Sequence, residues 1–217
     1  MSYRASKYID FDNGTVQIAP MQLAATKTSP LTLDDKIDLF ECRVDVWQLG
    51  TAVALLTAIE SHQPPSIWSH AAYGLLACAI SYFEMLGKTL NPKSETSGTA
   101  GIDFNYGFCD VYPSFGSACG SYQDKAIPNV KQFRDRLRNG LYHLAYTKQH
   151  LWIHADESPT LDDFHVTTHS PPEFWVNPHR MVRSLVDHFP SFISRIRNPN
   201  NAHLRGGFEA FFDDYHK

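Results

Sequence analysis

The chain has 217 residues, of which 43% are hydrophobic and 19% are charged, and its formal net charge at pH 7 is −4. This composition is typical of a single globular domain spanning 1–217 and excludes an extensively disordered chain. The negative net charge excludes a protein that coats nucleic acid through a broadly basic surface, so any nucleic-acid site must be local.

The N-terminus and the cysteines indicate the compartment. Residues 1–10 are polar and lack the apolar segment of a signal peptide, and we expect no apolar run long enough to cross a bilayer. A cytoplasmic protein without a membrane partner is therefore the default expectation. None of the four cysteines forms a CxxC pair of the kind that binds zinc, and Cys42 and Cys78 lie in helical patterns where they suit a core.

The first elements expected along the chain are a short strand around Thr15–Ile18 and a helix that begins between Leu31 and Asp34. Thr32 can cap this helix, and the acidic residues that follow suit its positive end. Pro64-Pro65 end the segment. Its apolar residues recur at close to the helical period; they are Ile37, Phe40, Val44, Trp47, Leu55 and Ile59.

A second helix is expected after Ser66, which can cap it, and it should end at Asn91-Pro92. Residues 93–125 follow without a sustained period and are rich in Gly, Ser and Tyr, so we expect a long insert that serves as a flap or is partly disordered. The stripe of the second helix consists of Trp68, Ala72, Leu75, Ala79, Phe83, Leu86 and Leu90.

A third helix should begin near Pro128, and a fourth at Asn177-Pro178 with a kink at Pro190. Between them, 151–154 and 164–168 are expected to pair as a hairpin, and a short terminal helix should begin near Leu204. The prediction is an all-α four-helix bundle with its helical core at about 31–92 and 126–197. The four tryptophans are expected to anchor the core or the hairpin rather than to stack on bases; they are Trp47, Trp68, Trp152 and Trp175.

The third predicted helix carries the residues with the most chemical content. Its buried stripe should consist of Val130, Phe133, Leu137, Leu141 and Leu144. On a helical wheel four polar residues fall on the opposite half; they are Arg138, Asn139, Tyr142 and His143. Arginine can hold a phosphate and histidine can move a proton near neutral pH, which is sufficient equipment for cleaving RNA without a metal.

The stretch from Arg138 to His143 resembles the R-N-x-x-x-H form of the Rx4–6H motif of HEPN domains. The resemblance implies a helical bundle of toxin or defence systems that dimerises to form one composite RNA-cleaving site and needs no cofactor. It implies Arg138, Asn139 and His143 as the catalytic residues and the products as a 2′,3′-cyclic phosphate and a 5′-hydroxyl. The resemblance also allows an antitoxin as a protein partner. Four neighbours would bind the substrate; they are Lys131, Arg134, Arg136 and Tyr142.

Other interpretations of the sequence stay open. Arg183 and His188 have the same spacing, and Arg136 and His143 fit the longer form of the motif. The same helical domain can also be a non-catalytic module for dimerisation or for binding RNA or nucleotides. His154 and His165 are expected to be exposed on the hairpin rather than to bind a metal. The sequence contains no phosphate-loop, dinucleotide-binding or Ser-His-Asp signature.

Overall fold

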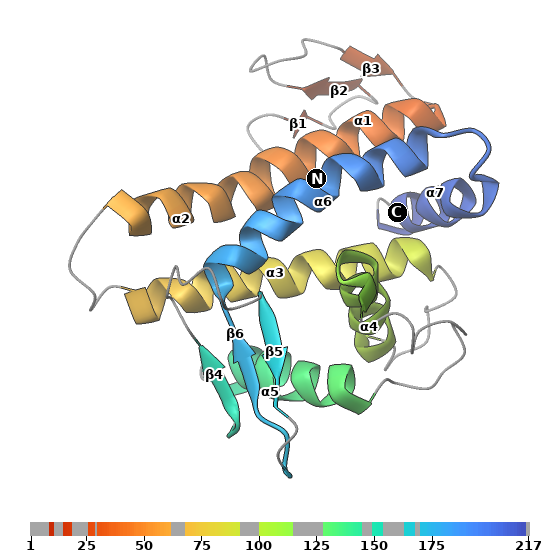
Figure 1. The fold of residues 1–217 in the computed structure, drawn as a ribbon. Helices are drawn as coiled ribbons and strands as arrows, with labels where there is room; N and C mark the ends of the chain where they lie inside the picture. The colour runs from red at the N-terminus through yellow and green to blue at the C-terminus, as the bar shows by residue number, and fades with distance from the viewer. Residues whose placement is uncertain are drawn as a thin grey trace.

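The structure is a computed structural model, and it describes residues 9–10, 15–18, 26–28, 30–61, 68–91, 100–114, 128–144, 149–153, 163–167 and 170–215. These residues are mostly helical, which confirms the predicted all-α class. Figure 1 shows the long N-terminal helix beside α6, with α3 beneath them and α5 at the opposite end of the molecule. The helices are α1 (Leu33–Arg43), η2 (Val44–Leu49), α2 (Gly50–Ser61), α3 (Trp68–Leu90), α4 (Ala100–Val111), α5 (Pro128–Leu144), α6 (Pro178–Arg197) and α7 (Ala202–Tyr215).

The N-terminal helix begins where the sequence predicted. Thr32 is its N-cap, and the Thr32 hydroxyl accepts a hydrogen bond from the Asp35 amide at 3.2 Å. The Asp35 carboxylate in turn accepts one from the Thr32 amide at 3.0 Å, which completes a capping box. Because both bonds form within four residues, the start of this helix could be predicted from the sequence.

The prediction of Trp47 as a core residue was wrong, because the middle of the helix is a π-helix. η2 joins α1 to α2 without a break, so that the buried stripe steps five residues, from Val44 to Leu49. A regular α-helix would continue the stripe at Trp47 or the next residue. The extra residue instead leaves Trp47 42% exposed and brings Leu56 rather than Leu55 into the core.

The insert expected at 93–125, as a flap or a partly disordered loop, contains a helix in its described part, whereas 93–99 and 115–125 lie outside the described residues. Residues 100–111 form α4, which packs along α3 and buries Phe104 and Phe108 completely. Two glycines permit this packing. An added Cβ would lie 1.7 Å from the Asp103 carbonyl oxygen at Gly87 and 1.9 Å from the Phe83 carbonyl oxygen at Gly107. The backbones of α3 and α4 are therefore in direct contact.

Aromatic rings connect this helix pair to α5. Phe83 packs edge-on against Phe104 and Phe108 at 5.4 and 5.3 Å between ring centroids. Phe108 packs against Phe133 of α5 at 5.4 Å, and Phe133 packs against Phe164 at 4.3 Å. Burial of such large rings stabilises the fold strongly, and it fixes the position of α5 relative to α3.

The predicted hairpin was wrong in its pairing. β4 (Leu151–Ile153) and β5 (Phe164–Val166) do not pair with each other, because both flank β6 (Phe174–Val176), which the sequence analysis missed. β4 is parallel to β6 and β5 is antiparallel to it. A second sheet, in which β2 (Thr15–Ile18) pairs with β1 (Ile9–Asp10) and β3 (Thr26–Thr28), confirms the strand predicted near the N-terminus.

α6 begins at the predicted Asn177, whose side chain accepts hydrogen bonds from the amides of His179 and Arg180. Pro190 lies inside this helix. The predicted stripe of α6 is buried throughout; it consists of Met181, Leu185, Phe189, Phe192 and Ile196. α7 confirms the predicted terminal helix.

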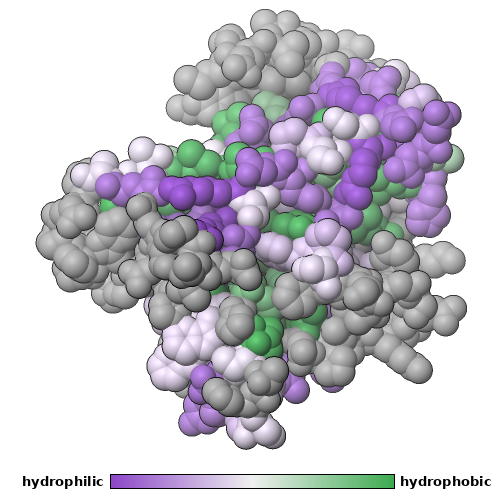
Figure 2. Space-filling model, viewed as in Figure 1, coloured by the Kyte–Doolittle hydropathy of each residue, from purple (hydrophilic) through white to green (hydrophobic). Residues whose placement is uncertain are grey.

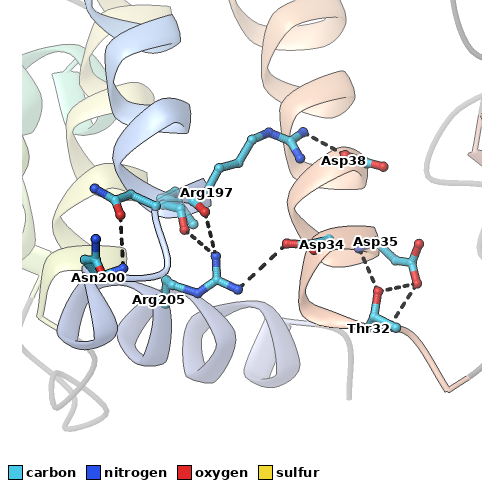
Figure 3. A network of polar contacts seen from close by, with 9 residues as sticks. Thr32, Asp34, Asp35, Asp38, Arg197, Asn200 and Arg205 are labelled. Atoms are coloured by element: carbon cyan, nitrogen blue, oxygen red, sulfur yellow. Dashed lines mark hydrogen bonds and ion pairs between the residues drawn. The ribbon is translucent and has the colours of Figure 1, made fainter.

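Figure 3 shows how α1, α6 and α7 are held at one end of the bundle. The Arg197 guanidinium donates to Asp38 at 2.7 Å and to Glu41 at 2.6 Å, which links the end of α6 to α1. Arg205 of α7 donates to the carbonyl oxygens of Ile196 and Arg197 at 3.0 Å, so it caps the last turn of α6. The ion pairs of Arg197 are exposed to solvent, so they orient the helices more than they stabilise them.

Contrary to the sequence expectation, one helix among the described residues has the length and apolar composition of a membrane span, namely Leu33–Ser61. Core helices of soluble proteins have the same length and composition. Val46 and Val53 are exposed on the outward side of this helix. Figure 2 shows hydrophobic side chains over this helix above a hydrophilic band. Cys42 and Cys78 are half-buried free thiols, whereas Cys109 of α4 is disulfide-bonded. The cytoplasmic location stays a prediction.

The contact between α3 and α4 predicts the effect of two substitutions. Gly87→Ala and Gly107→Ala each place a methyl group against a backbone carbonyl that cannot move without separating the helices. We expect each to lower the free energy of unfolding by about 2 kcal/mol. Urea denaturation of the variants and the wild type measures this difference.

Gly206→Ala is the matched control, because nothing lies within 4 Å of a Cβ at this helical glycine. Alanine has the higher helix propensity, so this variant should be more stable than the wild type by up to about 1 kcal/mol. The close helix contact is contradicted if Gly87→Ala and Gly107→Ala leave stability as high as Gly206→Ala does.

Candidate functional site

The predicted catalytic helix exists as α5, and its backbone runs through every residue of the motif from Arg138 to His143. The inner face of α5 is as expected over its described part, since Val130, Phe133 and Leu137 are completely buried. The side chains at 139–144 lie outside the described residues, and they include the predicted Asn139, Tyr142 and His143.

Arg138 is held in place by a carboxylate from another helix. Its Nε donates to Oε1 of Glu84, on α3, at 2.6 Å. The two side chains are 25% and 21% exposed, so the ion pair lies in a partly buried position at the surface between α3 and α5. Such a charge-assisted hydrogen bond restricts the rotamers of a long side chain. Arg138 is therefore less outward-facing than the helical wheel predicted.

The predicted substrate-binding arginines are engaged with the protein itself. Arg136 donates to the carbonyl oxygen of Pro172 at 2.6 Å, and its guanidinium lies 4.9 Å from the centre of the Phe174 ring. Burial lowers the pKa of Arg136 below its ordinary value. Arg134 pairs with Asp135 at 2.7 Å, whereas Lys131 is exposed on the outer side of α5.

The second Arg–His pair does not form a site. Arg183 donates to Glu60 of α2 at 2.5 Å, whereas His188 points toward α3 and α4. The two side chains leave α6 in different directions, so the spacing that they share with Arg138 and His143 does not bring them together. Arg136 also departs from the motif, because its guanidinium is directed at the sheet.

His188 belongs to a partly buried polar cluster between α3, α4 and α6 that sequence reasoning missed. Its Nδ1 lies 3.0 Å from the Tyr82 hydroxyl, and its Nε2 lies 3.2 Å from Asp110. Arg195 donates to both carboxylate oxygens of Asp110, to Oδ1 at 2.9 Å. We call these four residues the Asp110 cluster.

The protonation of the Asp110 cluster follows from its surroundings. Burial alone would raise the pKa of Asp110, but hydrogen bonds from His188 and Arg195 lower it below the ordinary value. Burial, followed by the charge of Asp110, raises the pKa of Tyr82. Both nitrogens of the His188 ring are engaged, so the cluster connects three helices through its polar contacts.

Among the residues that the structure describes, no group of three or more His, Cys, Asp or Glu is arranged to bind a metal ion. His154 and the side chain of His165, which the sequence placed on the hairpin, lie outside the described residues.

Trp152 and Trp175 were expected to anchor the core or the hairpin, and the structure places both on the sheet, where Trp152 is exposed and Trp175 is half-buried. Trp152 and Trp175 occupy paired positions on β4 and β6, and their rings are stacked at 5.6 Å with an angle of 25°. Trp152 is 49% exposed, since the side chains of a strand alternate between its two faces and the neighbouring Leu151 is the one that is buried.

Comparison of the chain with protein-family models, with functionally characterised proteins and with solved structures gives no match. The function is therefore argued from the residues of the chain and their contacts.

The lowered pKa of Asp110 predicts an acid-dependent loss of stability. The contribution of Asp110 is fully present above its ordinary pKa of 3.8 and is lost as the pH falls from there through the lowered value. Asp110→Asn should lower the free energy of unfolding near neutral pH by about 2 kcal/mol and flatten its decline in acid. Urea midpoints measured across the acid range test both effects.

Asp187→Asn is the control, because Asp187 is exposed on α6, directly before His188. It removes an equal charge without touching the cluster, so its acid dependence should follow the wild type. If the free energy of unfolding of Asp110→Asn fell with pH in parallel to that of the wild type, the cluster would not stabilise the charged carboxylate of Asp110 over its protonated form.

Proposed function

We propose that the protein is a metal-independent endoribonuclease of the HEPN type, with Arg138, Asn139 and His143 as its catalytic residues. The observation that carries this proposal is the ion pair between Arg138 and Glu84 at 2.6 Å. It holds the arginine of the motif at the surface of the bundle, five residues before His143 on the same helix. A fixed arginine is what a site for a phosphodiester requires, because positioning before the reaction lowers the barrier.

In the proposed reaction, the 2′-hydroxyl of RNA attacks the adjacent phosphorus and the bond to the 5′-oxygen breaks. A general base removes the proton of the 2′-hydroxyl, and a general acid protonates the leaving 5′-oxygen, so a 2′,3′-cyclic phosphate and a 5′-hydroxyl form. His143 serves these proton transfers because its ordinary pKa is near neutral. Arg138 binds the non-bridging oxygens and balances the charge that they gain in the transition state.

Two copies of α5 would complete the site in a homodimer. The face that carries the motif lies on a helix held from behind by buried Phe133 and Leu137, so it can meet a second copy without unfolding the core. One His143 would then act as the base and the partner's as the acid. Within each chain, we assign the four-helix bundle of the HEPN type to the N-terminal helix, α3, α5 and α6, with α4 as an addition.

His143→Ala should lower the rate of RNA cleavage by about 100-fold or more, since it removes general acid–base catalysis. Arg138→Ala should lower it by about the same factor, through loss of charge stabilisation. Glu84→Gln should reduce the rate less than either, because it loosens the arginine without removing it. The assay measures cyclic-phosphate ends from single-stranded RNA in the presence of EDTA.

Arg183→Ala is a matched control, because Arg183 also pairs with a glutamate and also precedes a histidine by five residues. This variant should keep the wild-type rate. Equal rates for the His143→Ala, Arg138→Ala and wild-type proteins would contradict the proposal and favour a non-catalytic binding module.

A further inference from the structure

We propose that Trp152 and Trp175 form a platform on which the bases of single-stranded RNA stack. This inference deepens the proposed function, since it names the class of substrate and the surface that holds it. The platform stands on the outer face of the sheet, whose inner face packs on α5 (Figure 1). Figure 2 shows pale side chains of intermediate hydropathy over β4 on the visible side of the molecule.

The sheet is built so that one face is buried and the other presents aromatic rings. Phe164, Phe174 and Val176 turn inward, and each is at most 5% exposed. The register places Trp152 of β4 opposite Trp175 of β6. The two indoles therefore share the outer face, and they lie nearly parallel at 25°.

Trp152 is the exposed member of the stacked pair, whereas Trp175 is half-buried. An aromatic ring that is 49% exposed loses much of the free energy that burial would provide. A nucleobase recovers it by stacking on the indole, and stacking is tolerant of sequence because every base has a flat aromatic face. Duplex RNA keeps its bases inside the helix, so the platform selects single strands.

The charge of the adjacent helix favours RNA over an uncharged partner. α5 carries four basic residues against one acidic residue, in a chain whose net charge is −4. Arg134 and Arg138 are paired with carboxylates, whereas Lys131 is exposed. β4 is an edge strand and lies against α5. Arg136 connects the two elements, since it contacts the carbonyl oxygens of His150 and Pro172 at 3.5 and 2.6 Å. A strand stacked on Trp152 can therefore pass around this edge toward the basic helix.

The test is the affinity of a fluorescently labelled oligouridylate, measured by anisotropy. His143→Ala serves as the parent protein, so that binding is measured without cleavage. Adding Trp152→Ala should weaken binding about tenfold, because one stacking contact is lost. Trp152→Phe should keep most of the affinity, since phenylalanine retains an aromatic face. Trp152 lies at the surface, and circular dichroism verifies that each variant is folded.

Trp47→Ala is the matched control, because Trp47 is similarly exposed, at 42%, but lies on the N-terminal helix. It should bind RNA like the parent. Equal affinity of the parent and the Trp152→Ala variant overturns the platform, and so does a parent that binds no oligouridylate. Binding that depends on Trp152 in a protein without any cleavage supports the platform and contradicts only the endoribonuclease. Cleavage that depends on His143, together with binding that is independent of Trp152, supports the endoribonuclease and contradicts only the platform.

Discussion

The direct contact between the backbones of α3 and α4 is the constraint on which the rest of the structure depends. It requires glycine at 87 and 107, and it brings Phe83 into the aromatic cluster with Phe104 and Phe108. That cluster receives Phe133 of α5 and, through it, the sheet. A wider separation of α3 and α4 would move the rings of this cluster apart, and α5 would lose its position relative to both elements.

The same contact positions the carboxylate that pairs with Arg138. Phe83 and Glu84 are neighbours on α3, so the ring that fixes the aromatic cluster and the carboxylate that holds Arg138 come from one turn of helix. The inner face of α5 is apolar and the adjacent face is basic, which is the division that an amphipathic helix provides. Rigid support from behind and charge in front are the arrangement that preorganised binding sites need.

How far the sequence predicted this arrangement depends on the range of the interactions. Caps such as Thr32 and Asn177 use partners within three residues, and the stripe of α6 repeats at the helical period, so both could be predicted. α4 could not, because Gly107 weakens a helical pattern and is explained only by its contact with α3. The partner of Arg138 lies 54 residues away, and β6 is recognised only once β4 and β5 flank it. The Asp110 cluster joins three helices, so no local pattern revealed it.

The π-helical turn of the N-terminal helix has a consequence for how its length can change. The added residue between Val44 and Leu49 keeps the apolar faces of α1 and α2 in phase, since each must meet α6. Deleting a single residue there would rotate α2 by about 100° about its axis relative to α1. Ala52, Leu56 and Ile59 would then turn away from α3 and α6, and the outward-facing Val53, Thr57 and Glu60 would take their places. Insertions and deletions in this helix are therefore constrained by the rotation that they impose on α2.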